Sequence, residues 1–364
     1  MPINKIITTS FCDQNFYVGI DVHKKSWSIS VRTSGIEVEH FTQQPDPAAL
    51  CRHLKNKYKD ALFYSAYEAG FSGTQAHTIL CNLGIQNCIV HPGDIPQTNK
   101  QQTNKTDFHD SKAIAKYLEA QLLNSIYIMP IEQQERRALF RQREGKVKDI
   151  TRCVNKLKGM LNFFGVVLPN EFADKTYISR NLIAWLQQLT LNTTAGTDTL
   201  QQYINELIYQ RQQLLRINRR IKKSVSEYYD GQYKSLLSVP GIGPITAMGL
   251  LTETGDLSRF DKQPDEFASY LGLIPCERSS AEHLYSKHIQ SRCNRHLRPL
   301  LIEAAWVAIT KSPALLAFYK KHAGVNGKKA IIKVARKLSL IAKAVALTKT
   351  KYQEGYVSGK TPGM

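Results

Sequence analysis

The sequence lacks the features of a secreted, membrane or thiolate-metal protein. Its 364 residues include seven cysteines, and no two of them form a Cys-x-x-Cys pair. That arrangement argues against a zinc ribbon and against a disulfide scaffold. No apolar run approaches the length of a membrane span, and no signal-peptide pattern opens the chain. A GxxxxGK[ST] phosphate-binding loop is also absent, so we expect no ATP-dependent step. We therefore expect a cytoplasmic protein that contacts no membrane.

Acidic residues are scarce relative to basic ones. The chain has 49 Lys and Arg against 30 Asp and Glu, which gives a formal net charge of +19. A balance so far from neutral points to a polyanionic partner, usually nucleic acid. A solvated basic surface or a ribosome-associated protein is the alternative. The hydrophobic share of 42% is typical of a globular protein, and the length suffices for two or three domains.

The first 128 residues alternate strand-like and helix-like patterns. The order is three strands, a helix, a strand, a helix, a strand and a helix. This order is typical of an RNase H-like fold, so we predict an α/β domain over residues 1–128. The predicted strands lie within 17–32, 36–42, 61–69 and 86–91, and the predicted helices cover 46–59, a segment ending near 83, and 107–122.

Four acidic residues lie at strand and helix positions that suggest a shared site. Asp21 interrupts an apolar strand, where a carboxylate is costly unless it is paired or bound to metal. Glu68 ends the fourth strand. Asp107 and Asp110 are three residues apart at a helix start, so they share one face. An RNase H-like sheet places its first and fourth strands side by side with the last helix next to them. The four carboxylates are thus predicted to converge and to bind Mg²⁺ or Mn²⁺, which prefer oxygen ligands.

Each acid also has a simpler local explanation. Asp107 can cap its helix, Asp110 can complement the helix dipole, and Glu68 can be a solvated strand end. The joint fit of all four to one fold favours a metal site. Two ions roughly 3.5–4 Å apart in such a site would support phosphoryl transfer. Nearby basic residues are interpreted as contacts to substrate phosphate or as surface residues; they are His23, Lys105, His109 and Lys112.

Residues 129–232 change character and predict a helical linker or arm. Apolar residues recur at spacings of three and four over about 133–165 and 200–229, as in a coiled-coil seam. A short helix near 181–188 and a polar loop over 191–199 lie between them. The stripe either packs inside an antiparallel arm or pairs with a second chain. Its members are Val147, Ile150, Val154, Leu157, Leu161, Phe164, Ile204, Leu207, Leu214, Ile217 and Ile221.

A mainly α-helical domain is predicted over residues 233–352. Its segment SVPGIGPITAMGLL matches a helix-hairpin-helix turn. Gly241 and Gly243 free the backbone there, so that amide groups can face a DNA phosphate. The turn can equally be purely structural. The last residues, 353–364, are predicted to form a flexible tail.

Farther along this domain, a polar segment contains Ser279 and Ser280 and is followed by several arginines. A serine beside arginines is a candidate nucleophile, because the cations can hold its phosphate adduct. A helix-capping or loop serine is the simpler explanation from the residues alone. The basic residues expected to contact nucleic acid are Arg292, Arg295, Arg298, Lys328, Lys329, Lys333 and Arg336.

Seven segments in order carry a family resemblance across nearly the whole chain: GIDVHK, YEAG, TDFHDSKAIA, SVPGIGPITA, YLGLIP, SSAE and NRHLRPLLIEAAW. In these segments the sequence resembles the DEDD-type insertion-sequence transposases of bacteria. These are bridge-RNA-guided serine recombinases, related to pilin-gene DNA invertases. The resemblance implies an RNase H-like domain of the RuvC type, a coiled-coil linker and a C-terminal transposase domain.

The resemblance also implies a mechanism. Asp21, Glu68, Asp107 and Asp110 would form the metal-binding tetrad, and Ser280 would attack the scissile phosphate to form a phosphoserine. Homodimers or homotetramers would act on element-end and target DNA at the nucleoid, guided by a structured non-coding RNA.

The sequence departs from the family pattern at two places. Ala281 follows Ser280 where glycine is usual, which leaves Ser279 as the neighbouring candidate nucleophile. Cys293 replaces a glycine before the Asn-Arg pair. Three alternatives to a transposase remain at this point. One is a site-specific invertase with the same chemistry, and another is a hydrolytic RNase H-like nuclease of the junction-resolvase type. The third is a non-enzymatic nucleic-acid-binding protein, although the presence of all four acids counts against it.

Overall fold

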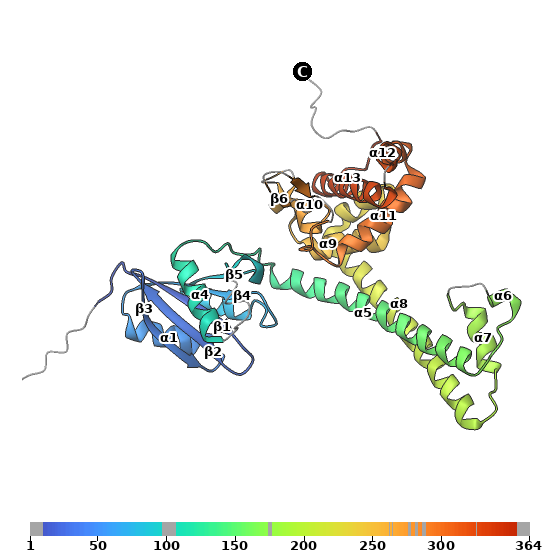
Figure 1. Ribbon diagram of the computed structural model, residues 1–364, viewed down its shortest axis with the longest axis horizontal. Coiled ribbons are helices and arrows are strands. Elements are labelled where there is room, and N and C mark those ends of the chain that lie inside the picture. The colour runs from blue at the N-terminus through green and yellow to red at the C-terminus, as the bar shows by residue number, and fades with distance from the viewer. Residues whose placement is uncertain are drawn as a thin grey trace, which may run out of the picture. The chain divides into compact units, whose positions relative to one another are not determined.

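The computed structural model describes residues 10–96, 107–173, 177–261, 263, 265–275, 278–280, 283–285, 289–324 and 326–354. The side chains of residues 107–109, 173, 278–280 and 283–285 lie outside this description. The chain divides into two compact units, residues 1–128 and 129–364. Figure 1 shows a sheet with helices in the first unit and an almost wholly helical second unit. Each unit is described by itself.

The first unit is built on a mixed five-stranded sheet in the order β3-β2-β1-β4-β5. The strands β3, β2 and β1 run antiparallel, whereas β1, β4 and β5 run parallel. This order is compatible with an RNase H-like fold, and it places the first and fourth strands side by side as the sequence predicts. The strands are β1 (Asn15–Val22), β2 (Trp27–Thr33), β3 (Ile36–Gln43), β4 (Leu62–Glu68) and β5 (Gln86–Val90).

Side-chain alternation along β1 gives the sheet two different faces. Phe16, Val18 and Ile20 are buried in one core with residues of α1 (Pro47–Lys57) and α2 (Gln75–Asn82). A short 3-10 helix, η1 (Pro92–Asp94), follows β5. The opposite face is covered by α4 (Asp107–Glu119), which packs on β1, β2 and β4. The predicted cap of α1 is confirmed, because Asp46 accepts hydrogen bonds from the amides of Ala48 and Ala49.

The second unit begins with two long helices that lie side by side, α5 (Ile131–Phe163) and α8 (Thr194–Leu237), as Figure 1 shows. The short helices α6 (Asn170–Ala173) and α7 (Arg180–Gln188) connect them. Leu157, Leu161, Ile204 and Leu207 share one core. This part of the predicted stripe therefore packs within the chain. We expected a polar loop over 191–199, but α8 already starts at Thr194 because the Thr193 hydroxyl accepts from the Gly196 amide.

The rest of the second unit is mainly helical around one large core. Gly241 has φ +84°, and a Cβ there would lie 2.2 Å from the backbone oxygen of Ala304. Glycine at this position thus permits the turn between α8 and α9 (Pro244–Thr254) to pack closely on α11 (Leu297–Lys311). No single helix of the described segments is long and apolar enough to cross a membrane. The neighbouring helices α11 and α12 (Pro313–Ala323) together meet the criteria of length and composition, but they are bent by 110° relative to each other. The elements are α9 (Pro244–Thr254), η2 (Leu257–Phe260), α10 (Glu266–Leu271), β6 (Arg278–Ser280), β7 (His283–Tyr285), α11 (Leu297–Lys311), α12 (Pro313–Ala323) and α13 (Gly327–Thr348).

Candidate functional site

The first two candidate metal ligands lie at the ends of neighbouring parallel strands. β1 and β4 pair in register up to Ile20 opposite Tyr67, which is one residue before Asp21 and Glu68 respectively. Gly19 and Ala66 are also opposite each other, two residues before the acids. Because alternate residues of a strand share a face, Asp21 and Glu68 stand on the same face as Gly19 and Ala66. Both carboxylates are thus at one sheet edge, below α4.

The helix α4 comes unusually close to β1 on this face. A Cβ at Gly19 would lie 2.1 Å from the backbone oxygen of Ser111 and 2.4 Å from the nitrogen of Ala115. Only glycine leaves room for this contact. Asp110 directly precedes Ser111 and is half-buried, and Asp107 starts the helix one turn earlier. The backbone therefore brings the first turn of α4 to the strand end that carries Asp21.

A buried polar contact ties the same elements together. Ser28 is the cross-strand partner of Asp21, and its Oγ lies 3.1 Å from the Oγ of Ser111. His40 on β3 completes this contact, with its Nε2 3.2 Å from Ser28 Oγ and 3.4 Å from Ser111 Oγ. Burial lowers the pKa of His40, and Lys112 lowers it further. A neutral imidazole suits hydrogen bonding to two hydroxyls. The sequence analysis missed His40, whose only signal was its place in an alternating strand.

The basic residues predicted near the acids are now placed in part. His23 Nε2 lies 3.0 Å from Asp21 Oδ2, and the Asp21 side chain keeps 17% of its surface exposed. Lys112 forms an ion pair with Glu37 at 2.9 Å. Lys105 and the side chain of His109 lie outside the described residues. His23 is therefore in direct contact with a candidate metal ligand.

The donor set fits a hard divalent cation. Carboxylate oxygens are the ligands that Mg²⁺ and Mn²⁺ prefer, and the backbone brings the positions of all four acids to one edge. Within the described side chains, no three His, Cys, Asp or Glu groups form a metal-binding cluster. The Asp107 side chain is outside that set. The completed tetrad therefore stays a prediction.

The polar segment that contains the candidate nucleophile includes two short paired strands, β6 and β7, and both serines lie on β6. β6 and β7 pair antiparallel, with Ser279 opposite Leu284 and Ser280 opposite His283. The side chains of both serines lie outside the described residues. The choice between these two candidate nucleophiles on β6 therefore stays a prediction.

At the base of this β6–β7 hairpin, the segments 274–275 and 289–290 are joined by backbone pairing. Pro275 bridges Ile289, and the Gln290 amide donates to the Ile274 oxygen at 3.1 Å. The Arg298 guanidinium donates to the backbone oxygens of Leu271 and Gln290. Arg298 was predicted to contact nucleic acid, and the structure gives it this internal role.

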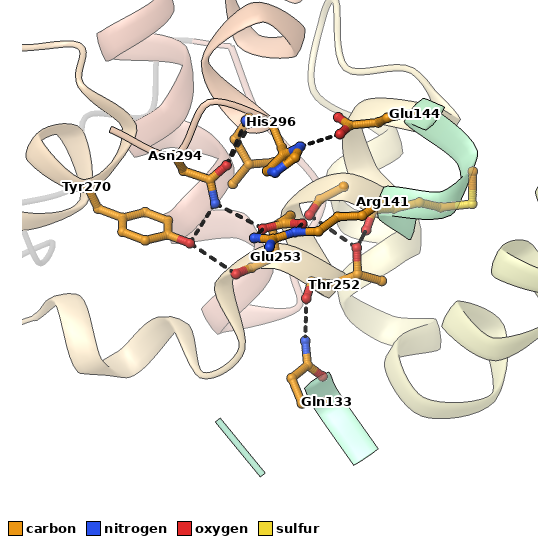
Figure 2. Close-up of polar contacts among 11 residues, drawn as sticks. Gln133, Arg141, Glu144, Thr252, Glu253, Tyr270, Asn294 and His296 are labelled. Atoms are coloured by element: carbon orange, nitrogen blue, oxygen red, sulfur yellow. Dashed lines mark hydrogen bonds and ion pairs between the residues drawn. The ribbon is translucent and has the colours of Figure 1, made fainter. Parts of the chain in front are cut away.

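A buried polar network lies next to the hairpin base (Figure 2). The Glu253 side chain is 0% exposed and accepts two hydrogen bonds from Arg141, at 2.7 and 2.8 Å. Asn294 Nδ2 donates to Glu253 Oε2 at 3.1 Å and to the Tyr270 hydroxyl at 2.7 Å. Hydrogen bonding to Glu253 raises the pKa of Arg141, and burial raises the pKa of Tyr270. Both groups therefore keep their protons over the physiological range.

The network joins α5 to the segment that leads into α11. Asn294 also accepts from the amides of His296 and Leu297, which begin α11. His296 Nδ1 pairs with Glu144 on α5, as Figure 2 shows. The sequence analysis missed this network. Its only local signal was a lone acid, Glu253, in an otherwise apolar helix, which is the signal that singled out Asp21.

The other predicted nucleic-acid contacts divide into exposed and internally used residues. Lys328, Lys329 and Lys333 are exposed on α13. Arg336 on the same helix forms an ion pair with Asp265. Arg292 and Arg295 are exposed just before α11. Gly243 precedes Pro244 at the start of α9, and a Cβ there would meet nothing within 4 Å.

Comparison with known sequences gives consistent matches in both units. The DEDD transposase profile of the IS110 type matches residues 18–165, and the profile of the transposase IS116/IS110/IS902 family matches residues 233–320. The first match contains all four candidate metal ligands, and the second contains the serine hairpin.

Individual relatives agree with the profiles. A Sinorhizobium fredii protein named as a transposase is 27% identical over 80% of this chain and 71% of its own length. The transposase for insertion sequence element IS1533 of Leptospira borgpetersenii is 25% identical over 80% of this chain and 84% of its own. The transposase for insertion sequence element IS1111A of Coxiella burnetii is 26% identical over 61% of this chain and 59% of its own.

Proposed function

Because the chain belongs to the IS110 family of DEDD transposases, we propose that it cuts and rejoins DNA strands with a carboxylate tetrad and a serine nucleophile. The observation that carries the proposal is the meeting of three elements at one sheet edge. The register of β1 with β4 places Asp21 beside Glu68, and the close contact at Gly19 brings the first turn of α4 to the same edge.

The tetrad would hold divalent cations. Asp21, Glu68, Asp107 and Asp110 would be the ligands of Mg²⁺ or Mn²⁺, which supplies Lewis acidity toward a phosphate oxygen. His23, which contacts Asp21 at 3.0 Å, would orient that carboxylate. The family suggests a divalent ion without specifying which one.

The serine would conserve the energy of the DNA backbone. The Ser280 oxygen forms a bond to the scissile phosphorus, while the bond from phosphorus to the departing strand oxygen breaks and that oxygen takes up a proton. The departing hydroxyl, or one from another strand, then attacks the phosphoserine and releases Ser280. Each step exchanges one phosphodiester for another, so no nucleotide triphosphate is consumed. Ser279, the preceding residue of β6, is the alternative nucleophile.

The experiment that tests this mechanism looks for a covalent adduct. The protein is incubated with Mg²⁺, element-end DNA and RNA transcribed beside its gene, and products are separated on a denaturing gel and mapped by peptide analysis. We expect an adduct on Ser280 that disappears in Asp21→Asn and in Ser280→Ala. Cleavage without any adduct would instead support a hydrolytic nuclease. Strand rejoining in a Ser279→Ala/Ser280→Ala double variant would contradict the serine nucleophile, because a strand hydroxyl would then attack the phosphodiester directly.

We further infer that a structured non-coding guide RNA selects the DNA sites and that the chain acts as a homodimer or homotetramer. The net charge of +19 supports binding to RNA backbone and shape. Leu157, Leu161, Ile204 and Leu207 of the predicted stripe pack within the chain, whereas Val147 and Phe164 are exposed and would be open to a second chain. Recombination that is equal with and without RNA would exclude the guide. Light scattering of the purified protein, alone and on DNA, would measure the oligomeric state.

A further inference from the structure

The helices α11 to α13 carry a large excess of positive charge. Residues 297–348 contain ten Lys and Arg but a single acidic residue, Glu303. Three of these cations interact within the protein. Arg298 donates hydrogen bonds to backbone oxygens, and Arg336 and Lys343 form ion pairs with aspartates. The remaining seven are exposed, which leaves a strongly basic surface. These exposed cations are Lys311, Lys320, Lys321, Lys328, Lys329, Lys333 and Lys337.

An aromatic pair, the exposed Trp306 and the half-buried Tyr319, lies within this basic surface. Trp306 on α11 is 44% exposed, although its neighbours Ala305 and Ala308 are fully buried. Its ring centroid lies 5.8 Å from that of Tyr319 on α12, at an interplanar angle of 60°. Tryptophan is enriched at binding surfaces, where its large ring supplies contact area.

The aromatic pair and the lysines are contiguous. A Cβ at Gly327 would lie 2.9 Å from the Tyr319 hydroxyl, so the first turn of α13 sits against Tyr319. Lys328 and Lys329 follow Gly327 directly, and both are exposed. Lys320 follows Tyr319 on α12 and is also exposed. We call Trp306, Tyr319, Lys320, Lys328 and Lys329 the α11–α13 surface.

We propose that the α11–α13 surface binds an unpaired DNA strand. Aromatic faces stack on bases that are free of a duplex, and flanking cations hold the phosphates, which is how proteins bind single strands without reading sequence. A duplex offers the lysines its phosphates but offers Trp306 no free base face. The proposal rests on the proposed function, because cutting and rejoining strands exposes unpaired ends. That origin favours DNA over RNA.

The surface is close to the serine hairpin along one rigid helix. Arg298, in the first turn of α11, holds the hairpin base, and Trp306 lies nine residues after Leu297 on the same helix. Nine residues of α-helix span about 14 Å. A strand that passes the hairpin base would thus reach Trp306 within a few nucleotides, since stacked nucleotides rise roughly 3.4 Å each.

The test measures strand binding by the full-length protein. Fluorescence anisotropy of a labelled oligo(dT) strand and of a duplex of equal length gives the two affinities. We expect Trp306→Ala to weaken single-strand binding about tenfold, because one base stack is lost, and to leave duplex binding unchanged. Trp306→Phe should retain most of the affinity. Phe163→Ala removes an aromatic side chain that is 82% exposed on α5, and it serves as the matched control without effect.

A charge variant checks the second half of the surface. Lys328→Gln/Lys329→Gln lies on an exposed helix turn and should fold normally. It should lower the salt dependence of oligo(dT) binding by a slope of about 1.4, since each phosphate contact to a single strand contributes roughly 0.7. Unchanged affinity and slope in this variant would contradict the proposal.

Other outcomes separate the failure of this proposal from the failure of the proposed function. Single-strand binding that is unaffected by Trp306→Ala, with duplex binding intact, overturns the α11–α13 surface and leaves the transposase activity standing. Absence of all DNA binding contradicts the proposed function itself. Trp306-dependent binding that is tighter to oligo(U) RNA, or to phosphatidylserine vesicles, than to oligo(dT) also overturns the proposal. An equal loss of single-strand and duplex affinity with a lower unfolding temperature would make Trp306 structural.

Discussion

Glu253 is a carboxylate without solvent contact in a helix that is buried from Thr246 to Thr254. Its side chain is 0% exposed, whereas its partner Arg141 retains 41% exposure. The two ends of this ion pair are therefore not equivalent. Losing the arginine leaves a charge in the interior, while losing the carboxylate leaves a cation that can turn toward water. Asn294 depends on the same carboxylate, so the start of α11 and the hairpin base depend on it as well.

This asymmetry predicts the result of a double-mutant cycle. Arg141→Met should lower the free energy of unfolding of the second unit by about 3 kcal/mol, because a buried carboxylate loses its charge partner. Glu253→Gln should cost only about 1 kcal/mol, since the amide keeps the shape and can still hydrogen-bond. Denaturant unfolding of both single variants and the double variant gives the coupling.

The double variant is the control for this prediction. Arg141→Met/Glu253→Gln should be nearly as stable as Glu253→Gln alone, because the charge that made the arginine necessary is gone. Additive losses in the double variant would show that Arg141 acts through its packing on α5 rather than through Glu253.

At the scale of elements, the strand order of the first unit was predictable because period-two alternation and turns are local signals. β4 and β5 fall within the predicted ranges, β1 to β3 exceed theirs by one or two residues, and the pairing of β1 with β4 followed from that order. Helix boundaries were harder to predict, because they depend on capping side chains. The hydroxyl of Thr193 starts α8 inside a segment whose composition predicted a loop.

Contacts between residues distant in sequence were not predictable. The Arg141–Glu253 pair spans 112 residues, and His40 meets Ser111 across 71 residues. No local repeat in the sequence links the two members of either pair. Gly19 could be quoted from the sequence as part of GIDVHK, but only the packing of α4 shows that a Cβ would meet the backbone of Ser111. Apolar patterns predict which face is buried, while polar partners depend on which elements meet.

The contact of β3 with α1 offers a prediction on pH. Glu39 accepts hydrogen bonds from His53 at 3.1 Å and Tyr58 at 3.1 Å, and pairs with Lys57 at 2.7 Å. Burial acts to raise the pKa of Glu39, but the bonds from Lys57, His53 and Tyr58 outweigh it, and the pKa falls below the ordinary 4.5. A carboxylate with a lowered folded pKa stabilises the fold above its unfolded pKa and loses that contribution as pH falls through the folded value.

The measurement compares wild type with Glu39→Gln in denaturant at several pH values. At pH 7 the variant should be less stable by about 1 kcal/mol, as expected for a partly exposed, hydrogen-bonded charge. The difference should shrink as pH falls below 4.5 and through the lower folded pKa. A difference that stays constant down to acid pH would mean that Glu39 contributes by shape and not by charge.

At the scale of the whole molecule, the net charge of +19 is a poor guide to which cations bind a ligand. Part of the positive charge holds the protein together, as with Arg141 on Glu253 and Lys343 on Asp261. DNA affinity depends on the cations that remain exposed, because each phosphate contact releases condensed counterions. The structure therefore separates exposed cations from internally paired ones, which the sequence analysis treated alike. Lys333 and Arg336 on α13 allow a direct comparison of the two kinds.

Salt titration of duplex binding should distinguish these two residues. The logarithm of affinity falls with the logarithm of salt with a slope of about 0.9 for each phosphate contact. Lys333 is exposed, so Lys333→Gln should reduce the slope by about that amount. Arg336 is paired with Asp265, so Arg336→Gln should leave the slope unchanged and should lower stability by less than about 1 kcal/mol. If Arg336→Gln reduces the slope as much as Lys333→Gln, DNA must displace Asp265 on binding. The DNA-binding residues of α13 would then include Arg336, which is paired with Asp265 in the free protein.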